Sequence, residues 1–269
     1  MKHASSSKNW KLIILCSILI LSVGLTAVFA VSLALEMYTR QQTQTFYSSM
    51  PVEYKPRTVQ AAPKGGTSVN VTTEPADIPT VHVPFLDFDS TRETLPDIVA
   101  WLQSYGTVIN YPVVRGSDND FYLSHLPDQS RNKMGSIFVD YRNQADFSDQ
   151  NILLYGHNMA SGDLFGSLKQ YSDQNYFEQH SSMFLFTPTA DFELLLFAGY
   201  VLDSAQEVPP MGFKDQADFE RYAADISRRS VFKSNVEIDF GDQLIFLCTC
   251  TPGGSKDERL IIVCKPVRI

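Results

Sequence analysis

Cys250 is the residue of this sequence best placed for covalent chemistry. It ends the apolar run Leu244–Cys250 and is followed by the turn residues Thr251–Gly254. A thiol at the end of a strand, beside a loop rich in Gly and Pro, is open to a substrate. Only the thiolate attacks well, so the residue needs a positively charged partner. Cys250 is therefore a candidate nucleophile, and the alternative is a small buried side chain without chemistry.

His157 could carry the proton transfers that such a thiol requires. It follows the predicted strand Asn151–Tyr155 directly, so its imidazole would lie at the rim of a sheet, where it could act as base and acid. The alternative is a histidine that only hydrogen-bonds a loop. The other histidines after the N-terminal apolar run lie in polar connections or near the start of the body: His82, His125 and His180.

Arg259 opens the last predicted strand, nine positions after Cys250. If the residues between them form a hairpin connection, both side chains lie at the same end of adjacent strands. A guanidinium there could donate hydrogen bonds to a developing oxyanion. The alternative is a strand-end charge, solvated or paired with Asp257 or Glu258. Spacing alone does not establish a catalytic triad, so these readings stay open at this point.

The remaining cysteines leave at least one thiol unpaired. The sequence has four cysteines, of which Cys16 lies in the N-terminal apolar run and three lie near the C-terminus. An odd number cannot all pair within one chain. A disulfide between Cys248 and Cys264, across neighbouring strands, is conceivable, but the sequence does not establish it.

An uncharged run of 24 residues, Leu12–Leu35, predicts a membrane anchor. A helix of that length rises about 1.5 Å per residue and crosses a hydrocarbon core of roughly 30 Å. A cleaved signal peptide would usually have a shorter apolar region of about 7–15 residues. Because three lysines precede the run and no acidic residue does, the positive-inside rule predicts a cytoplasmic tail over 1–11 and an extracellular body. We expect a single-pass cell-membrane protein whose anchor, 12–35, contacts lipid.

The rest of the chain divides into a stalk and a body. Residues 36–81 contain repeated Gln, Pro and Gly and predict an irregular extracellular stalk. Residues 82–269 predict the folded domain. Of the 22 basic side chains, three precede the anchor, so the remainder carries 19 against 30 acidic ones, a net charge of −11. This acidic balance argues against nucleic acid as a partner.

The body is predicted to be mainly β. Ser90 and Glu93 have the spacing of a capping box, and the apolar residues that follow have helical spacing, so we expect a short helix that ends at Gly106. A second helix is expected between Lys214 and Arg229. Short apolar runs bounded by turn residues predict seven strands: Val108–Val114, Ser136–Asp140, Asn151–Tyr155, Met183–Thr187, Phe192–Val201, Gln243–Thr251 and Leu260–Val267. Many short strands with few helices favour a closed barrel or a sandwich.

No cofactor is expected from the sequence. His157 has no second His or Cys at ligand spacing, so no metal site is predicted. No Gly-rich phosphate loop precedes a helix.

Several segments resemble class B sortases, in order along the chain. They are Asp97–Trp101, Tyr111–Val114, Gly135–Phe138, Asp140–Asn143, Tyr155–Met159, Leu247–Cys250 and Arg259–Val263. The resemblance covers roughly residues 85 to 269, and it implies the eight-stranded sortase barrel with an N-terminal helix and a helix between strands six and seven. It implies catalytic roles for His157, Cys250 and Arg259. It also implies that Asn119, Leu123 and Thr249 contact the substrate. Cys248 departs from the family pattern, which commonly has serine there.

The resemblance implies a cysteine transpeptidase of a Gram-positive cell surface. Such an enzyme cleaves a C-terminal sorting signal after Thr and joins the surface protein to an amino group of a peptidoglycan precursor. The expected partners are therefore the sorting-signal peptide, that amine, and membrane lipid around the N-terminal helix. Three alternatives stay open: a cysteine hydrolase without transfer, a pilin-polymerising sortase, and a surface binding module without turnover.

Overall fold

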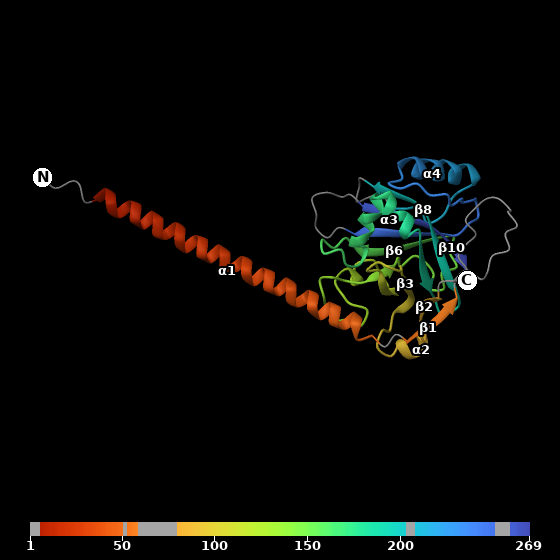
Figure 1. The fold of residues 1–269 in the computed structure, drawn as a ribbon, viewed down its shortest axis with the longest axis horizontal. Helices are drawn as coiled ribbons and strands as arrows, with labels where there is room; N and C mark the ends of the chain where they lie inside the picture. Colours follow the sequence, from red (N-terminus) through yellow and green to blue (C-terminus); the bar gives the residue numbers. More distant parts are fainter. Residues whose placement is uncertain (1–5, 51–52, 59–79, 203–207, 251–258) are drawn as a thin grey trace. The chain divides into compact units, whose positions relative to one another are not determined.

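The structure is a computed structural model that describes residues 6–50, 53–58, 80–202, 208–250 and 259–269 (Figure 1). It divides into two compact units, Met1–Met50 and Pro51–Ile269. The first residues of the expected tail, the middle of the expected stalk (59–79) and the turn that follows Cys250 lie outside the described residues.

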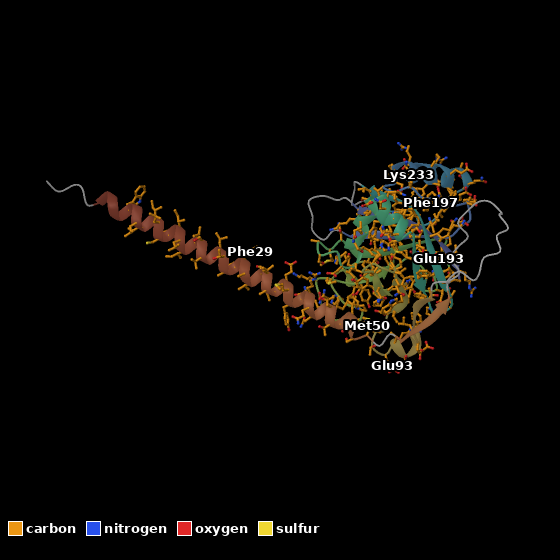
Figure 2. The ribbon with its side chains drawn as sticks, in the orientation of Figure 1. Phe29, Met50, Glu93, Glu193, Phe197 and Lys233 are labelled. Carbon is orange, nitrogen blue, oxygen red and sulfur yellow. The ribbon has the colours of Figure 1, made fainter. Side chains whose placement is uncertain are left out.

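The first unit is one long helix, α1 (Ser6–Ser48). By length and composition it could cross a membrane over Leu12–Tyr47, with a mean hydropathy of 2.8. Its apolar side chains project from the helix on all sides; Phe29, for example, is 70 % exposed (Figure 2). The helix therefore includes the run 12–35, which is the expected anchor, and it is a candidate membrane span. It also continues into the region expected to be irregular, because the glutamines there are good helix formers and no Gly or Pro occurs before Pro51.

The second unit begins with a two-stranded ribbon. β1 (Glu53–Thr58) pairs in antiparallel register with β2 (Thr80–Phe85). α1, β1 and β2 all overlap the range 36–81, so the expectation that the whole of it is irregular is wrong for residues 36–48, 53–58 and 80–81. The boundaries of an extracellular stalk stay a prediction.

A closed eight-stranded barrel forms the rest of the second unit and confirms the expected fold (Figure 1). Around the barrel the order is β10-β8-β7-β3-β4-β5-β6-β9. Its strands are β3 (Ile98–Gln103), β4 (Asn110–Val114), β5 (Ile137–Val139), β6 (Asn151–His157), β7 (Ser182–Phe186), β8 (Asp191–Leu202), β9 (Leu244–Cys250) and β10 (Arg259–Arg268). The helical elements of this unit are α2 (Phe88–Thr91), η1 (Phe121–Leu123), η2 (Phe165–Ser172), α3 (Gln174–Gln179) and α4 (Gln216–Arg229).

The helix predicted between Ser90 and Gly106 is largely wrong. Only α2, a single turn capped by the side chain of Asp87, is helical there, and β3 occupies most of the remainder. β3 lies between β4 and β7, and five of its six residues are buried. In a strand buried on both faces nearly every position is apolar, so a helical spacing can be found in it by chance. The β-branched and aromatic residues of Ile98–Trp101 suit a strand.

The predicted helix between the sixth and seventh barrel strands is confirmed as α4. Asp215 caps its N-terminus by accepting a hydrogen bond from the Asp218 N–H. Phe219 and Ile226, 3 % and 0 % exposed, pack against the outer face of β8, β9 and β10. The helix thus seals one side of the sheet that carries Cys250.

Alternate residues of the central strands fill the two faces of the sheet. One set, including Tyr155, Phe246 and Ile261, belongs to the outer cluster beneath α4. The other set, including Leu154 and Leu247, is fully buried and fills the barrel interior. Since both faces are buried, a slip of one residue in strand register would place every side chain on the wrong face.

A glycine in β8 allows the end of α4 to dock. The Val231 N–H donates to the Gly199 carbonyl at 2.6 Å, and the Ser230 hydroxyl accepts from the Gly199 N–H at 3.0 Å. A Cβ on Gly199 would lie 2.7 Å from Phe232 Cε1 and 2.9 Å from Ile262 Cδ1. Overpacking at such a site costs about 1–3 kcal/mol.

We expect Gly199→Ala to lower the free energy of unfolding by about 1–3 kcal/mol, because Phe232 and Ile262 must move. Gly212→Ala is the matched control, since its Cβ would meet only the flexible Gln150 side chain at 3.6 Å. Urea denaturation of the two variants measures the difference. Equal stability of the two alanine variants would contradict this packing.

Candidate active site

Strand register brings the three candidate catalytic residues together. β6 and β9 are parallel, with His157 paired to Cys250, so both strands end at the same level. β10 runs antiparallel to β9 with Ile261 opposite Cys248, and two further residues in that register put Arg259 opposite Cys250. Neighbouring strands lie roughly 4.8 Å apart, and paired residues share a face. We call these three positions the terminal row.

The imidazole of His157 is buried and oriented by one hydrogen bond. Its side chain is 3 % exposed, and Nε2 lies 2.6 Å from the carbonyl oxygen of Leu123. A carbonyl can only accept, so Nε2 carries the hydrogen. Nδ1 is buried and has no hydrogen-bond partner within the described part of the chain. The neutral ring therefore presents a lone pair on Nδ1, which is the atom available to exchange a proton.

Leu123, predicted to contact substrate, lies in η1 and reaches His157 through its backbone. Its side chain is half-buried and packs against the outer core cluster. The structure therefore gives Leu123 a second role that the sequence did not indicate, because no side-chain pattern reports a backbone acceptor.

Asn119, also predicted to contact substrate, uses its amide within the protein. Its Nδ2 donates to Asp140 Oδ2 at 3.1 Å, and its Oδ1 accepts from the Tyr141 N–H at 3.0 Å. These bonds tie the segment before η1 to the end of β5. The predicted contact with substrate stays a prediction.

Asp140 is a buried carboxylate that the sequence reasoning quoted in a motif but gave no role. It is 0 % exposed and accepts from Arg142 Nε at 2.8 Å, from Arg142 Nη2 at 2.7 Å and from the Tyr155 hydroxyl at 3.0 Å. Burial alone would raise the pKa of Asp140, but the hydrogen bonds from Arg142 and Tyr155 outweigh it and hold the pKa below its ordinary value. Tyr155 lies two residues before His157, so Asp140 connects the Asn119 segment to the strand that carries the histidine.

Thr249 lies behind the terminal row. Its side chain is 2 % exposed, and Oγ1 accepts from the Leu260 N–H at 2.9 Å. As the neighbour of Cys250 in β9, its side chain points to the opposite face of the sheet. Thr249 therefore aligns β9 with β10, and its predicted contact with substrate stays a prediction.

Cys248 and Cys264 are not joined to each other, so the disulfide considered from the sequence does not form. Cys248 is paired with Ile261 and Cys264 with Ile245, which places their side chains on opposite faces of the sheet. Both are buried, and burial raises the pKa of the Cys264 thiol. A thiol that is buried and protonated is a poor nucleophile.

Arg259 is half-buried, and within the described ranges it makes no ion pair. On its other side in the sheet it is paired with Leu202 of β8. Leu202 borders a cavity of about 460 Å³ under α4, lined mainly by aromatic and proline side chains together with Asp218 and Arg229. In the cavity wall, the hydroxyls of Tyr200 and Tyr222 lie 2.7 Å apart. No sequence pattern indicates this cavity, because its walls come from β8, α4 and the segment between them.

Comparison with known proteins agrees with this arrangement. A sortase-domain family model matches residues 103–267. The chain is 29 % identical to sortase B of Listeria monocytogenes over 231 residues, which is 86 % of this chain and 87 % of that protein. The structure of a Staphylococcus aureus sortase B–substrate complex has a TM-score of 0.64 and 28 % identity, covering 68 % of this chain and 85 % of that one. A sortase B complexed with triglycine has a TM-score of 0.64 and 28 % identity, covering 68 % and 86 %.

The family match covers more than half of the chain, and the relatives of class B extend over most of it. The fold matches those of solved class B sortases. The chain belongs to the sortase family of cysteine transpeptidases and is a class B sortase.

Proposed function

We propose that this sortase cleaves a sorting signal after Thr and joins the surface protein to an amino group of peptidoglycan. Cys250 is the nucleophile, His157 the acid and base, and Arg259 the group that stabilises the oxyanion. The observation that supports the proposal is the terminal row: His157 of β6 is paired with Cys250 of β9, and Arg259 begins β10 on the other side of β9. The complexes of related sortases with substrate and with triglycine support the two partners.

The first half of the reaction forms an acyl-enzyme. The Cys250 thiolate attacks the threonine carbonyl carbon, and the C–S bond forms as the carbonyl electrons move onto oxygen. Arg259 donates hydrogen bonds to that oxyanion. The C–N bond then breaks, and the imidazolium of His157 gives its proton to the leaving amine. Since Nε2 is held by Leu123, the transferable proton is the one on Nδ1.

The second half transfers the acyl group. An amino group of the peptidoglycan precursor attacks the thioester carbonyl, and neutral His157 accepts its proton. Collapse of the second tetrahedral intermediate breaks the C–S bond and returns the thiolate. An enzyme that admits water in place of the amine would be a hydrolase, so the identity of the acceptor separates the two activities.

The substrate peptide is proposed to lie over the outer face between η1 and α4. Asn119 and Leu123 border that face on one side. The cavity beside Leu202 borders it on the other side, next to Arg259 in the sheet. Its aromatic and proline lining suits apolar side chains of a peptide. Thr249 is proposed to contact the peptide through its backbone, since it is the neighbour of Cys250 in β9 and its side chain is bonded to the Leu260 N–H.

The N-terminal helix is proposed to hold the enzyme at the outer surface of the cell membrane. Three lysines precede its uncharged part, which favours a cytoplasmic N-terminus and contact of that part with lipid. The body then lies on the side where sorting signals and peptidoglycan precursors meet.

Purified full-length protein in detergent should transfer a sorting-signal peptide to labelled triglycine. Cys250→Ala should abolish the product, because no acyl-enzyme can form. Cys248→Ser and Cys264→Ser are the controls, and both should retain transfer, since both thiols are buried. Mass spectrometry of the products gives the result. Cleaved peptide without any triglycine adduct would indicate a hydrolase, and product from Cys250→Ala would remove the nucleophile assignment.

Arg259→Lys should lower transpeptidation by about 10²–10³, because lysine keeps the charge but loses the planar fork of donors. An exposed ion pair at a strand end contributes only about 0–1 kcal/mol, so a surface role would make the change nearly silent. The measurement is the initial rate beside a thermal melt that verifies folding. A folded variant within about threefold of the parent, far short of the loss of an oxyanion donor, would leave His157 and Cys250 as a dyad.

The anchor predicts that the protein stays with the membrane fraction after an alkaline wash. Protease added to cells stripped of their wall should digest the body and spare cytoplasmic proteins. A variant that lacks residues 1–35 is the control and should be recovered outside the membrane fraction. Recovery of a soluble form of the intact gene product that begins near residue 36 would show a cleaved signal peptide instead.

A further inference from the structure

The group that orients His157 is a backbone carbonyl. Over the ranges that the structure describes, no carboxylate hydrogen-bonds to the ring, and the one contact of Nε2 is the Leu123 oxygen at 2.6 Å. An acceptor on a side chain could be turned toward the ring by rotation about the bonds of that side chain, without movement of the backbone. A backbone acceptor is only as well placed as the two peptide units around it, so the segment that holds Leu123 determines the orientation of the histidine.

The carbonyls on both sides of Leu123 are fixed by one returning stretch of chain. The Tyr122 oxygen accepts from the Ser136 N–H at 2.9 Å. The Ser124 oxygen accepts from the Asn132 N–H, also at 2.9 Å. These two carbonyls are thus occupied, and the Leu123 carbonyl between them is turned toward His157.

Gly135 lies against that carbonyl. Its φ is +63°, a conformation that glycine adopts at little cost. A Cβ there would lie 2.6 Å from the Tyr122 oxygen and 2.8 Å from the Leu123 oxygen. Both distances are well inside van der Waals contact, so a side chain at this position would push the acceptor of His157 away.

Tyr122 anchors the same segment to the barrel. Its ring is fully buried, and its hydroxyl donates to Asp97 Oδ2 at 2.6 Å. Asp97 directly precedes β3, and its own carbonyl accepts from the Arg115 N–H at 3.0 Å. If the hydroxyl of Tyr122 were removed, the Asp97 carboxylate would still accept a hydrogen bond from Gln129. The substitution would therefore alter the anchoring of Tyr122 without leaving Asp97 unpaired.

We propose that Gly135 and Tyr122 are positioning residues of the enzyme, which hold the Leu123 carbonyl against Nε2 of His157. The histidine is thereby kept with its hydrogen on Nε2, and Nδ1 is left for proton exchange. The effect on turnover rests on the proposed transpeptidase function. The effect on the tautomer of His157 does not, and it can be measured in a protein that performs no chemistry.

The tautomer is measured by NMR on full-length Cys250→Ala protein in detergent, with histidine labelled with nitrogen-15. His157→Gln identifies the resonances of His157 among the five histidines. At a pH where the ring is neutral, we expect the parent to show one protonated and one unprotonated ring nitrogen. Gly135→Ala should move both resonances toward the values of an exposed histidine, because the acceptor of Nε2 is displaced.

Gly241→Ala is the matched control. Gly241 also has a positive φ, +104°, but a Cβ there would meet nothing within 4 Å. It therefore reproduces the backbone strain of Gly135→Ala without contact at the Leu123 carbonyl. Its His157 resonances and its rate of transpeptidation should match the parent. In the active protein, Gly135→Ala should lower kcat on the order of 10²-fold, the effect of a displacement of about 1 Å at a reacting group.

Tyr122→Phe decides the matter if Gly135→Ala does not fold. We expect a smaller shift of the His157 resonances in the same direction, together with a lower kcat. Parent-like resonances and rate in the folded variant would overturn the proposal. A shifted tautomer with an unchanged kcat would overturn the positioning role. If the parent itself transfers no peptide, the proposed function fails, and the NMR result still tests how His157 is held.

Discussion

The parallel pairing of β6 with β9 is the constraint on which the site depends. It places His157 beside Cys250 at the ends of two strands, and the antiparallel return of β10 places Arg259 on the far side of the cysteine. Register is strongly specified where faces are buried, because a slip of one residue moves every side chain to the opposite face, where it does not fit. The apolar residues of these strands are buried on both faces, so the same packing that stabilises the barrel also aligns the backbone positions of His157, Cys250 and Arg259.

The outer face of this sheet is covered from two directions by different physical means. α4 covers β8, β9 and β10 with apolar side chains, among them Phe219 and Ile226. The segment around η1 packs the buried ring of Tyr122 beside Phe138 and Tyr155, and it is also held by hydrogen bonds, among them that of Asn119 to Asp140. Apolar packing tolerates small shifts, whereas hydrogen bonds fix distance and direction. The side that orients His157 is thus the side on which hydrogen bonds add direction to the apolar packing.

The sequence predicted the strand-end positions of the three candidate residues better than it predicted the contacts that hold them. Seven strands and α4 followed from short apolar runs and helical spacing, and the positions of His157, Cys250 and Arg259 at strand ends followed from them. β3 was assigned to a helix because a strand buried on both faces carries no alternating pattern. The carbonyl of Leu123 could not be predicted, since a backbone atom leaves no trace in side-chain identity. The burial of Asp140 could not be predicted either, because its donors come from three separate segments.

The burial of Asp140 links the fold to the chemistry. A buried charge is costly unless it is fully hydrogen-bonded. Arg142 supplies three donors to this carboxylate, and Tyr155 and Asn119 supply one each. Because two of these residues lie on β6 and on the segment before η1, the carboxylate is satisfied only when strand and segment take one relative position. That position is the one in which the Leu123 carbonyl meets His157, so the requirement to satisfy a buried charge also selects the orientation of the imidazole.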